Sequence, residues 1–213
     1  MSDEAAVIAD IVGSRTLPDR AAAQRAIVAT ADRVHADHPV AGAPLTATVG
    51  DEFQAVYPGL AAALTSLLLV QLHLPDAVQL RFGVGVGAVD PVDESITDGP
   101  GWWAARAAID EAHRLQDRAV PRARTRIAAA EGQDAVMLHR IAYANAYLLA
   151  RDDLVASMSE RTRRLTYGRC LGRTQRELAE AEGVTQPAVS QALASAGSAA
   201  LVAGFADLSR ELS

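Results

Sequence analysis

The sequence predicts an α+β protein in which a ferredoxin-like N-terminal domain over residues 1–132 precedes an all-α domain over residues 133–213. Three observations support this class. Apolar periodicities in the first part follow the order β-α-β-β-α-β, which is the order of a ferredoxin-like unit. From residue 134 onward the pattern is helical throughout. Within that helical part, residues 173–194 have the spacing of a helix-turn-helix unit.

Each N-terminal element follows from a local pattern. In chain order we expect a buried strand (5–12), a helix (20–38), a hairpin of two strands (45–49 and 53–57) and an apolar helix (60–74). A central strand (78–89), a polar loop (90–100), a helix (102–117) and a last strand (125–130) should follow. Pro39 ends the first helix, and the turn at Gly50 joins the hairpin strands. The helices should cover one face of the sheet, and the domain boundary should fall near residues 130–135.

The helix-turn-helix prediction rests on residue types at fixed spacing. Ala179 allows two helices to approach, Gly183 suits the sharp turn, and Val189 points back into a small core. Thr185 is placed to cap the second helix, and Pro187 is acceptable in that helix's first turn. An ordinary helical hairpin is the alternative.

Such a unit predicts double-stranded DNA as a partner. Helical spacing places Gln186, Ser190 and Gln191 on the outer face, where glutamine suits adenine edges. Six arginines and no carboxylate lie in residues 161–176, and we expect these arginines to contact phosphate. The predicted DNA-binding residues are Arg173, Arg176, Thr185, Gln186, Ser190 and Gln191.

Composition limits the location. The 213 residues carry a net charge of −6, half of them are hydrophobic, and the single Cys170 forms no internal disulfide, as is usual in a reducing compartment. The first residues are acidic rather than basic, so we expect no signal peptide. The apolar run over residues 60–74 is too short and too interrupted for a membrane span. We therefore expect a cytoplasmic protein with no membrane partner.

Four short motifs should converge at one end of the predicted sheet. They are A-D-I-V-G-S-R with Asp10, V-G-D-E-F-Q with Asp51 and Glu52, the strand R-F-G-V-G-V-G, and D-G-P-G-W-W-A-A-R with Arg106. Asp10 and Asp51 are placed to share a divalent cation, and such oxygen ligands suit Mg²⁺, which in turn holds phosphates. Helix N–H groups and Arg106 would add phosphate contacts.

Each motif also has a structural interpretation. Asp10 would then cap a turn, and Asp51 with Glu52 would form a solvated hairpin tip. The glycines of the central strand leave room either for a flat ligand or for a closely packed helix. One of Trp102 and Trp103 offers a stacking face, and the other belongs to the core. The convergence of all four motifs favours a binding site.

These motifs resemble those of the SatD family, which carries G-D-I-V-x-S-R, T-x-G-D-E-F-Q, R-F-G-x-G-x-G and D-G-P-x-x-x-x-A-R in this order. The resemblance covers residues 5–115 well, with the helix-turn-helix in the expected place. We predict that the matched positions bind a nucleotide or a nucleotide-derived ligand: Asp10, Ile11, Ser14, Arg15, Gly50, Asp51, Glu52, Asp98, Gly99 and Arg106.

More distantly, the N-terminal domain is similar to the class III nucleotide cyclases and the GGDEF cyclases. The resemblance implies that Asp10 and Asp51 are the metal-binding aspartates, that Ile11 offers a backbone carbonyl, and that Arg106 lies near the position of the transition-state arginine. The sequence also differs from these cyclases at three functional positions. Ala47 stands where the base-reading lysine would be, Trp102 where the ribose-orienting asparagine would be, and Val49 replaces the first glycine of GGDEF.

The nucleotide-binding motifs and the helix-turn-helix together predict a regulatory protein that senses a nucleotide with Mg²⁺ and binds DNA. We expect it not to be an enzyme, and no catalytic residue is assigned. The alternative is an active metal-dependent nucleotidyl cyclase or transferase with a helical interaction module. A third alternative is a structural adaptor. Because adjacent carboxylates repel, replacing Asp10 or Asp51 by Asn should leave the fold intact or slightly stabilised.

We also expect a homodimer, since two recognition helices would then reach two half-sites. One candidate surface lies in residues 134–158, and another is an apolar stripe on the terminal helix. The alternative is that either stripe covers its own domain. The apolar residues of the first surface are Val136, Ile141, Tyr143, Leu148, Leu149 and Val155. Those of the terminal helix are Leu201, Val202, Phe205, Leu208 and Leu212.

Overall fold

A five-stranded sheet with the order β2-β3-β1-β4-β7 forms the N-terminal part of the computed structural model, which describes residues 4–48, 50–91 and 97–212. β1 pairs antiparallel with both β3 and β4, and β7 adds a parallel strand beside β4. The predicted α+β class is confirmed, and β1 to β4 have the strand order of a ferredoxin-like unit. The strands are β1 (Ala5–Ile11), β2 (Thr46–Ala47), β3 (Glu52–Tyr57), β4 (Leu80–Val86) and β7 (Thr125–Ala129).

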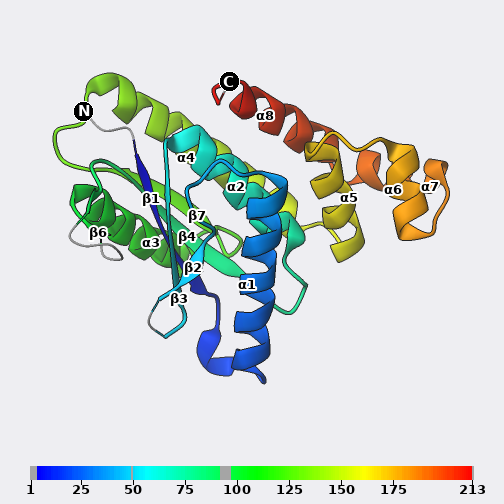
Figure 1. The fold of residues 1–213 in the computed structure, drawn as a ribbon, viewed down its shortest axis with the longest axis horizontal. Coiled ribbons are helices and arrows are strands. Elements are labelled where there is room, and N and C mark those ends of the chain that lie inside the picture. Colours follow the sequence, from blue (N-terminus) through cyan, green and yellow to red (C-terminus); the bar gives the residue numbers. More distant parts are fainter. Residues whose placement is uncertain (1–3, 49, 92–96, 213) are drawn as a thin grey trace.

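Helices cover both faces of this sheet (Figure 1). α1 (Arg20–Asp37) and α2 (Leu60–His73) lie on one face, and α3 (Pro100–Arg118) lies on the other. Side chains alternate along β1, so Val7 packs toward α1 and α2 while Ile8 packs toward α3. The expectation of helices on one face therefore holds for α1 and α2 only.

The central strand β4 lies against the backbone of α3. A Cβ atom built on Gly83 or Gly85 would lie well inside the contact distance of the carbonyl oxygens of Ala105 and Gly101. Of the two interpretations of this glycine strand, the closely packed helix is correct, and the flat ligand above these glycines is wrong.

Several boundaries differ from the predicted ones. β2 has only two residues, and Val49, where that strand was expected to end, lies outside the described residues. The predicted loop over residues 90–100 contains a small two-stranded sheet of β5 (Asp90–Pro91) and β6 (Thr97–Asp98), with residues 92–96 outside the description. A short 3₁₀ helix, η1 (Ser14–Thr16), follows Gly13, whose φ of 68° suits glycine.

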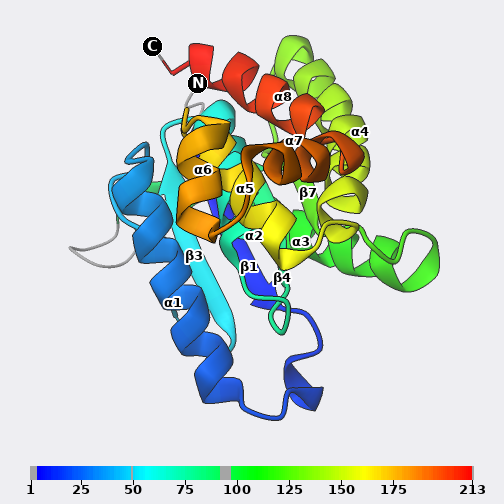
Figure 2. The ribbon, with the colours of Figure 1, turned by 90° about the vertical axis from the view of Figure 1, so that its right-hand side faces the viewer.

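The C-terminal part is helical, as predicted, and packs closely on the sheet domain (Figure 2). α4 contacts β7, and α5 and α8 contact α2, so that one hydrophobic cluster continues from the sheet into these helices. The predicted boundary near residues 130–135 falls between β7 and α4. The five helices are α4 (Ala135–Ala156), α5 (Glu160–Cys170), α6 (Gln175–Glu182), α7 (Gln186–Ser195) and α8 (Ser198–Arg210).

The two stripes offered as dimer surfaces are largely used within the chain. Ile141, Leu148 and Val155 on α4 are buried in the main cluster, as are Leu201 and Phe205 on α8. These residues cover their own core and are not free for a partner. On α4, Val136 and Tyr143 remain exposed, with 61% and 79% of their surface accessible.

No single helix in the described ranges is both long and apolar enough to cross a membrane; α7 and α8 reach that length and composition only as a pair bent by 81°.

Candidate functional site

A row of charged side chains crosses three neighbouring strands at one end of the sheet. Asp10 on β1 is the register partner of Glu52 on β3 and of Arg81 on β4. Arg81 donates two hydrogen bonds to the Asp10 carboxylate, Nε to Oδ1 and Nη2 to Oδ2, both at 3.0 Å. This fork is the strong, planar form of an arginine–carboxylate pair. The side chain of Arg81 is 8% exposed and that of Asp10 is 30% exposed.

Helix α3 supplies the partners above this row. Arg106 lies 2.7 Å from an oxygen of Glu52 and is half exposed. Gln116 accepts a hydrogen bond from Nη1 of Arg81 at 3.0 Å. Like charges directly opposite each other in a sheet are unfavourable. Arg81 and Arg106 therefore neutralise the adjacent carboxylates of Asp10 and Glu52.

The other residues of the hairpin tip turn toward α1. Asp51 lies 3.5 Å from Nη2 of Arg20, and Gln24 donates a hydrogen bond to the carbonyl of Gly50 at 2.7 Å. Asp10 bonds Arg81 beside α3 and Asp51 pairs with Arg20 of α1, so the structure gives these two carboxylates separate partners. It brings together Asp10 and Glu52 instead.

The remaining predicted nucleotide contacts lie at the ends of these elements. Ile11 is buried as the last residue of β1, and Ser14 and Arg15 lie in η1 just beyond it, with Arg15 exposed. Asp98 accepts a hydrogen bond from the N–H of Gly99 at 2.7 Å, directly before α3.

The carboxylates do not form a prepared metal site. Both Asp10 oxygens accept hydrogen bonds from Arg81, while Asp51 is paired with Arg20. Within the described ranges, no group of three or more His, Cys, Asp or Glu side chains is placed to hold a metal ion. The oxygen chemistry suits Mg²⁺, but the geometry does not fit the predicted joint site of Asp10 and Asp51.

A groove of about 430 Å³ lies beside this charged row, at the start of α3. Ile8 and Gln54 form its sheet side, and Asp98 and Arg106 bring polar groups. Trp102 packs on the core cluster around Ile8 and donates a hydrogen bond from its indole N–H to Thr97 at 3.1 Å. Trp103 is 67% exposed at the same groove. One tryptophan thus belongs to the core and the other offers a free ring.

Sequence reasoning missed the arginines that pair with the carboxylates. Arg81 begins the quoted glycine-strand motif, but only the strand register reveals that it lies opposite Asp10. Arg20 shows no signal beyond its place at the start of α1. Gln54, in the V-G-D-E-F-Q motif, donates a hydrogen bond to Glu52 at 3.0 Å and lines the groove.

The helices of the second candidate site have well-defined ends. Thr174 and Glu177 form a capping box at the start of α6, in which Glu177 Oε2 accepts a hydrogen bond from the N–H of Thr174 at 2.6 Å. That bond and the one from the Thr174 hydroxyl lower the pKa of Glu177. Gly183 ends α6 with a φ of 65°, and Thr185 caps α7 through the N–H of Ala188 at 3.4 Å.

A separate small core fixes α6 against α7. Val189 is fully buried, together with Leu178, Ala179 and Leu193, against Leu165 of α5. On the outer side of α7, Gln186, Ser190 and Gln191 are exposed. The helices and the turn lie where the sequence predicts them, and recognition of DNA by this face stays a prediction.

Four of the arginines in residues 161–176 differ in their surroundings. Arg163 is mostly buried and pairs with Asp76 at 2.8 Å, and Arg164 pairs with Glu182 at 2.8 Å, which lowers the pKa of Glu182. These two arginines make ion pairs within the fold, and the Arg164 side chain remains 40% exposed. Arg173 and Arg176 are exposed, and Arg176 pairs with the exposed Glu180 on its own helix.

The sheet order and the capped helices define an α+β protein with a ferredoxin-like sheet and a helical C-terminal part. The SatD family model matches residues 4–201, and the chain belongs to the SatD family. None of the curated proteins matches it.

Among solved structures, two structures of a bacterial light-regulated adenylyl cyclase match part of this chain. The first has 15% sequence identity and a TM-score of 0.39, and the match covers 53% of this chain and 40% of that chain. The second has 15% identity and a TM-score of 0.40 over 59% of this chain and 74% of that chain. This chain therefore spans less than half the length of the first.

Proposed function

We propose that this protein is a DNA-binding regulator whose sheet domain senses a nucleotide. The observation that carries the proposal is the outer face of α7. Gln186, Ser190 and Gln191 are exposed there, on a helix that Val189 and Leu193 fix from the other side. A rigid short helix with free amide side chains suits the major groove, where glutamine pairs with adenine.

Phosphate contacts would come from the exposed arginines next to this face. Arg173 lies just before α6 and Arg176 lies in its first turn, while residues 185–200 carry no charge. Affinity would then come from few contacts, and its salt dependence would be shallow.

The DNA test begins with selection of bound duplexes from fragmented genomic DNA, followed by fluorescence anisotropy on a selected site. Gln191→Ala should cost roughly 1–3 kcal/mol there and relax the preference at one position. Arg173→Gln should weaken binding to all duplexes and reduce the salt slope by about 1. Arg25→Gln, an equal charge change on the exposed face of α1, is the control and should change neither. Failure to bind any duplex at low salt would refute the DNA half of the proposal.

The nucleotide half rests on the groove at the start of α3. Arg106 is half exposed and held in place by Glu52, and Trp103 presents a free ring to the same groove. A phosphate would compete with Glu52 for the Arg106 guanidinium, and a base would stack on Trp103. Since Arg81 already donates two hydrogen bonds to the Asp10 carboxylate, phosphate recognition here would rest on Arg106 and not on a bound cation.

Nucleotide binding is tested by thermal unfolding with ATP, GTP and cyclic dinucleotides, each with and without Mg²⁺. A ligand at 100 times its dissociation constant adds about 2.7 kcal/mol to the free energy of unfolding. We expect Arg106→Gln and Trp103→Ala to abolish the shift. A shift of the unfolding temperature that requires Mg²⁺ and disappears in Asp51→Asn would support the cation site predicted from the sequence. No shift with any nucleotide would refute this half.

The same samples decide the alternative function. An active nucleotidyl cyclase or transferase would release pyrophosphate from ATP or GTP, and chromatography of the incubated nucleotide would detect it. We expect no turnover, because Ala47 and Trp102 occupy the base-reading and ribose-orienting positions.

A further inference from the structure

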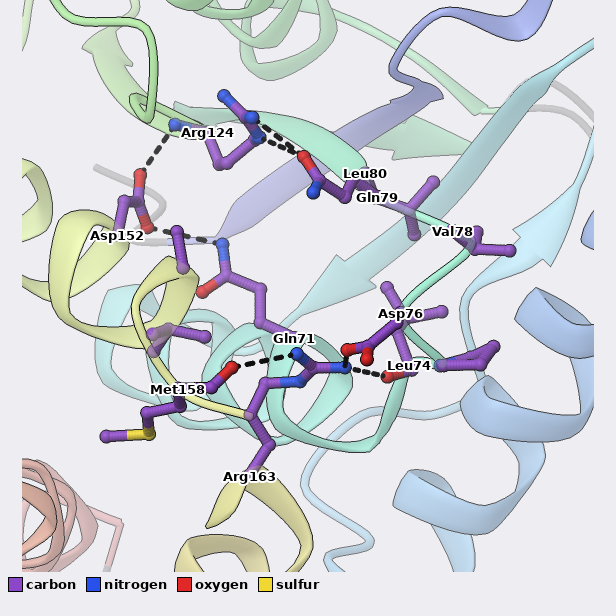
Figure 3. Close-up of a pocket in the computed structure, with 13 residues that line it drawn as sticks. Gln71, Leu74, Asp76, Val78, Gln79, Leu80, Arg124, Asp152, Met158 and Arg163 are labelled. Atoms are coloured by element: carbon purple, nitrogen blue, oxygen red, sulfur yellow. Dashed lines mark hydrogen bonds and ion pairs between the residues drawn. The ribbon is translucent and has the colours of Figure 1, made fainter. Parts of the chain in front are cut away.

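A second cavity lies between the sheet domain and the C-terminal helices. We call it the junction pocket, and it has a volume of about 280 Å³. The end of α2 and the start of β4 form one side, and the residues around the α4–α5 connection form the other (Figure 3). The pocket lies apart from the groove at the start of α3, with which it shares no lining residue.

The two arginines that line this pocket differ in their partners. Arg163 is paired with Asp76 at 2.8 Å, and Asp152 is paired with Arg151 at 2.8 Å. Arg124 has no carboxylate partner for its guanidinium in the part of the chain that the structure describes. It donates to the side-chain oxygen of Gln79 at 2.7 Å and to two backbone carbonyls at 2.8 Å. The Arg124 guanidinium is therefore held at the pocket wall by neutral acceptors.

Arg124 is partly buried, which makes its charge more costly than at the surface. Desolvation lowers the pKa of Arg124, and the nearby Arg81 adds to the effect, although Asp152 opposes it. Asp152 cannot serve as the partner, because its oxygens already accept hydrogen bonds from the backbone N–H groups of Arg124 and Thr125 and from Arg151. An anion from outside would relieve the cost.

The rest of the lining is apolar or incompletely bonded. Leu74, Val78, Leu80, Val155 and Met158 contribute apolar surface. Two further lining residues have buried polar atoms without a partner among the described residues, the side-chain oxygen of Gln71 and Nε of Arg163. Buried polar groups are rarely left unpaired in native proteins, so such atoms mark a place where something is missing.

We propose that the junction pocket binds a small organic monoanion, a carboxylic acid with an apolar body, whose carboxylate pairs with Arg124. A single guanidinium held by neutral acceptors suits one negative charge. The volume lies just below the range of roughly 300–1,000 Å³ typical of ligand pockets, which excludes a dinucleotide and suits a small metabolite. The apolar walls favour a ligand with a hydrocarbon body over a bare inorganic anion.

The site would also link two parts of the molecule. Arg163 belongs to α5, which packs against α6 and α7, whereas Arg124 immediately precedes β7. A ligand held in the pocket would contact the sheet side and the helical side at once.

The test uses a matched set of probes on the full chain. Hexanoate and hexanamide have nearly the same shape and differ in charge, and acetate has the charge without the apolar body. By isothermal titration we expect hexanoate to bind saturably at one site, hexanamide to bind at least about tenfold more weakly, and acetate not to bind in the same range. Thermal unfolding should shift upward with hexanoate alone.

Two variants locate the binding. Arg124→Gln should remove the difference between hexanoate and hexanamide, and Arg25→Gln is its control for charge. Because Arg124 also bonds the backbone, a second variant is needed. Ala156→Trp adds bulk at the exposed rim of the pocket, and it should weaken hexanoate at least about tenfold while leaving the unfolding midpoint near that of the parent.

Three outcomes would overturn the proposal: no saturable hexanoate binding, equal affinity for hexanamide, or unchanged binding in Ala156→Trp. These measurements contain neither DNA nor a nucleotide, so their result is independent of the regulatory function proposed above.

Discussion

At the scale of single residues, the Asp10–Arg81 pair reverses an expectation drawn from the sequence. Asp10 has Arg81 as a partner through two hydrogen bonds, and the Arg81 side chain is almost fully buried. Removing the carboxylate would leave a buried guanidinium without its counter-charge, which is strongly destabilising. The repulsion between adjacent carboxylates, on which the sequence argument rested, is already offset.

We therefore predict that Asp10→Asn lowers the free energy of unfolding by about 3 kcal/mol. Urea unfolding followed by circular dichroism measures it. The control is Asp153→Asn, which removes an exposed carboxylate paired with the exposed Arg122 and should cost well under about 1 kcal/mol. Equal stability of Asp10→Asn and the parent would mean that the fork does not persist in solution.

At the scale of elements, the contact between β4 and α3 depends on glycine. A methyl group on Gly85 would clash with backbone atoms of α3, which cannot move aside as a side chain can. Gly85→Ala should therefore cost at least about 2 kcal/mol of stability in urea unfolding. Gly42→Ala, at a position with nothing within 4 Å, should be neutral or slightly stabilising. A similar loss in both variants would contradict the packing argument.

The sequence predicts this level of structure well where the signal is local. Pro39 ends a helix and Thr174 and Thr185 begin helices whatever the fold around them, and the helices at these positions are present. The two-residue β2 and the face covered by α3 depend on contacts between distant segments. No local pattern encodes them.

The same distinction between local signals and contacts of distant segments applies to the candidate site. Asp10, Glu52 and Arg81 meet at one end of the sheet, and Arg106 reaches Glu52 there, whereas the D-G-P turn packs beside Ala88 and Asp90 beyond the other end of β4. Which carboxylate faces which helix depends on alternation at the hairpin tip, where the consecutive residues Asp51 and Glu52 turn to opposite faces. The sequence predicts a cation shared by Asp10 and Asp51, whereas the register places Glu52 beside Asp10.

At the scale of the whole molecule, assembly is open to a direct test. The apolar residues left exposed on α4 include Val136 and Tyr143, which are seven residues apart and share a face. We predict a dimer through this face, with a mass by light scattering near twice 22.4 kDa at micromolar concentration. Tyr143→Asp should return it to one chain without loss of stability, while Leu212→Asp, another exposed apolar position, should not. A parent mass near one chain would rule the dimer out.

Two histidines lie where the C-terminal helices pack on the sheet domain. His38 lies 3.0 Å from the hydroxyl of Thr65 and packs its ring on Phe205 of α8. His73 packs on Tyr167 of α5, with ring centroids 4.8 Å apart. Burial lowers the pKa of both, and for His73 the charges of Arg33 and Arg164 add to it while Asp37 opposes them.

Because these pKa values are lower in the folded chain than in the unfolded chain, the unfolded chain binds more protons at mildly acidic pH. The stabilisation is complete above the unfolded value of about 6.5 and is lost as the pH falls through the lowered folded values. We predict that the free energy of unfolding in urea decreases between pH 7 and pH 5.5, and that His38→Gln with His73→Phe flattens this dependence. His139→Gln, an exposed histidine on α4, should leave the slope unchanged. A parent protein with constant stability over this range would show that acid does not weaken the packing of α5 and α8 on α2.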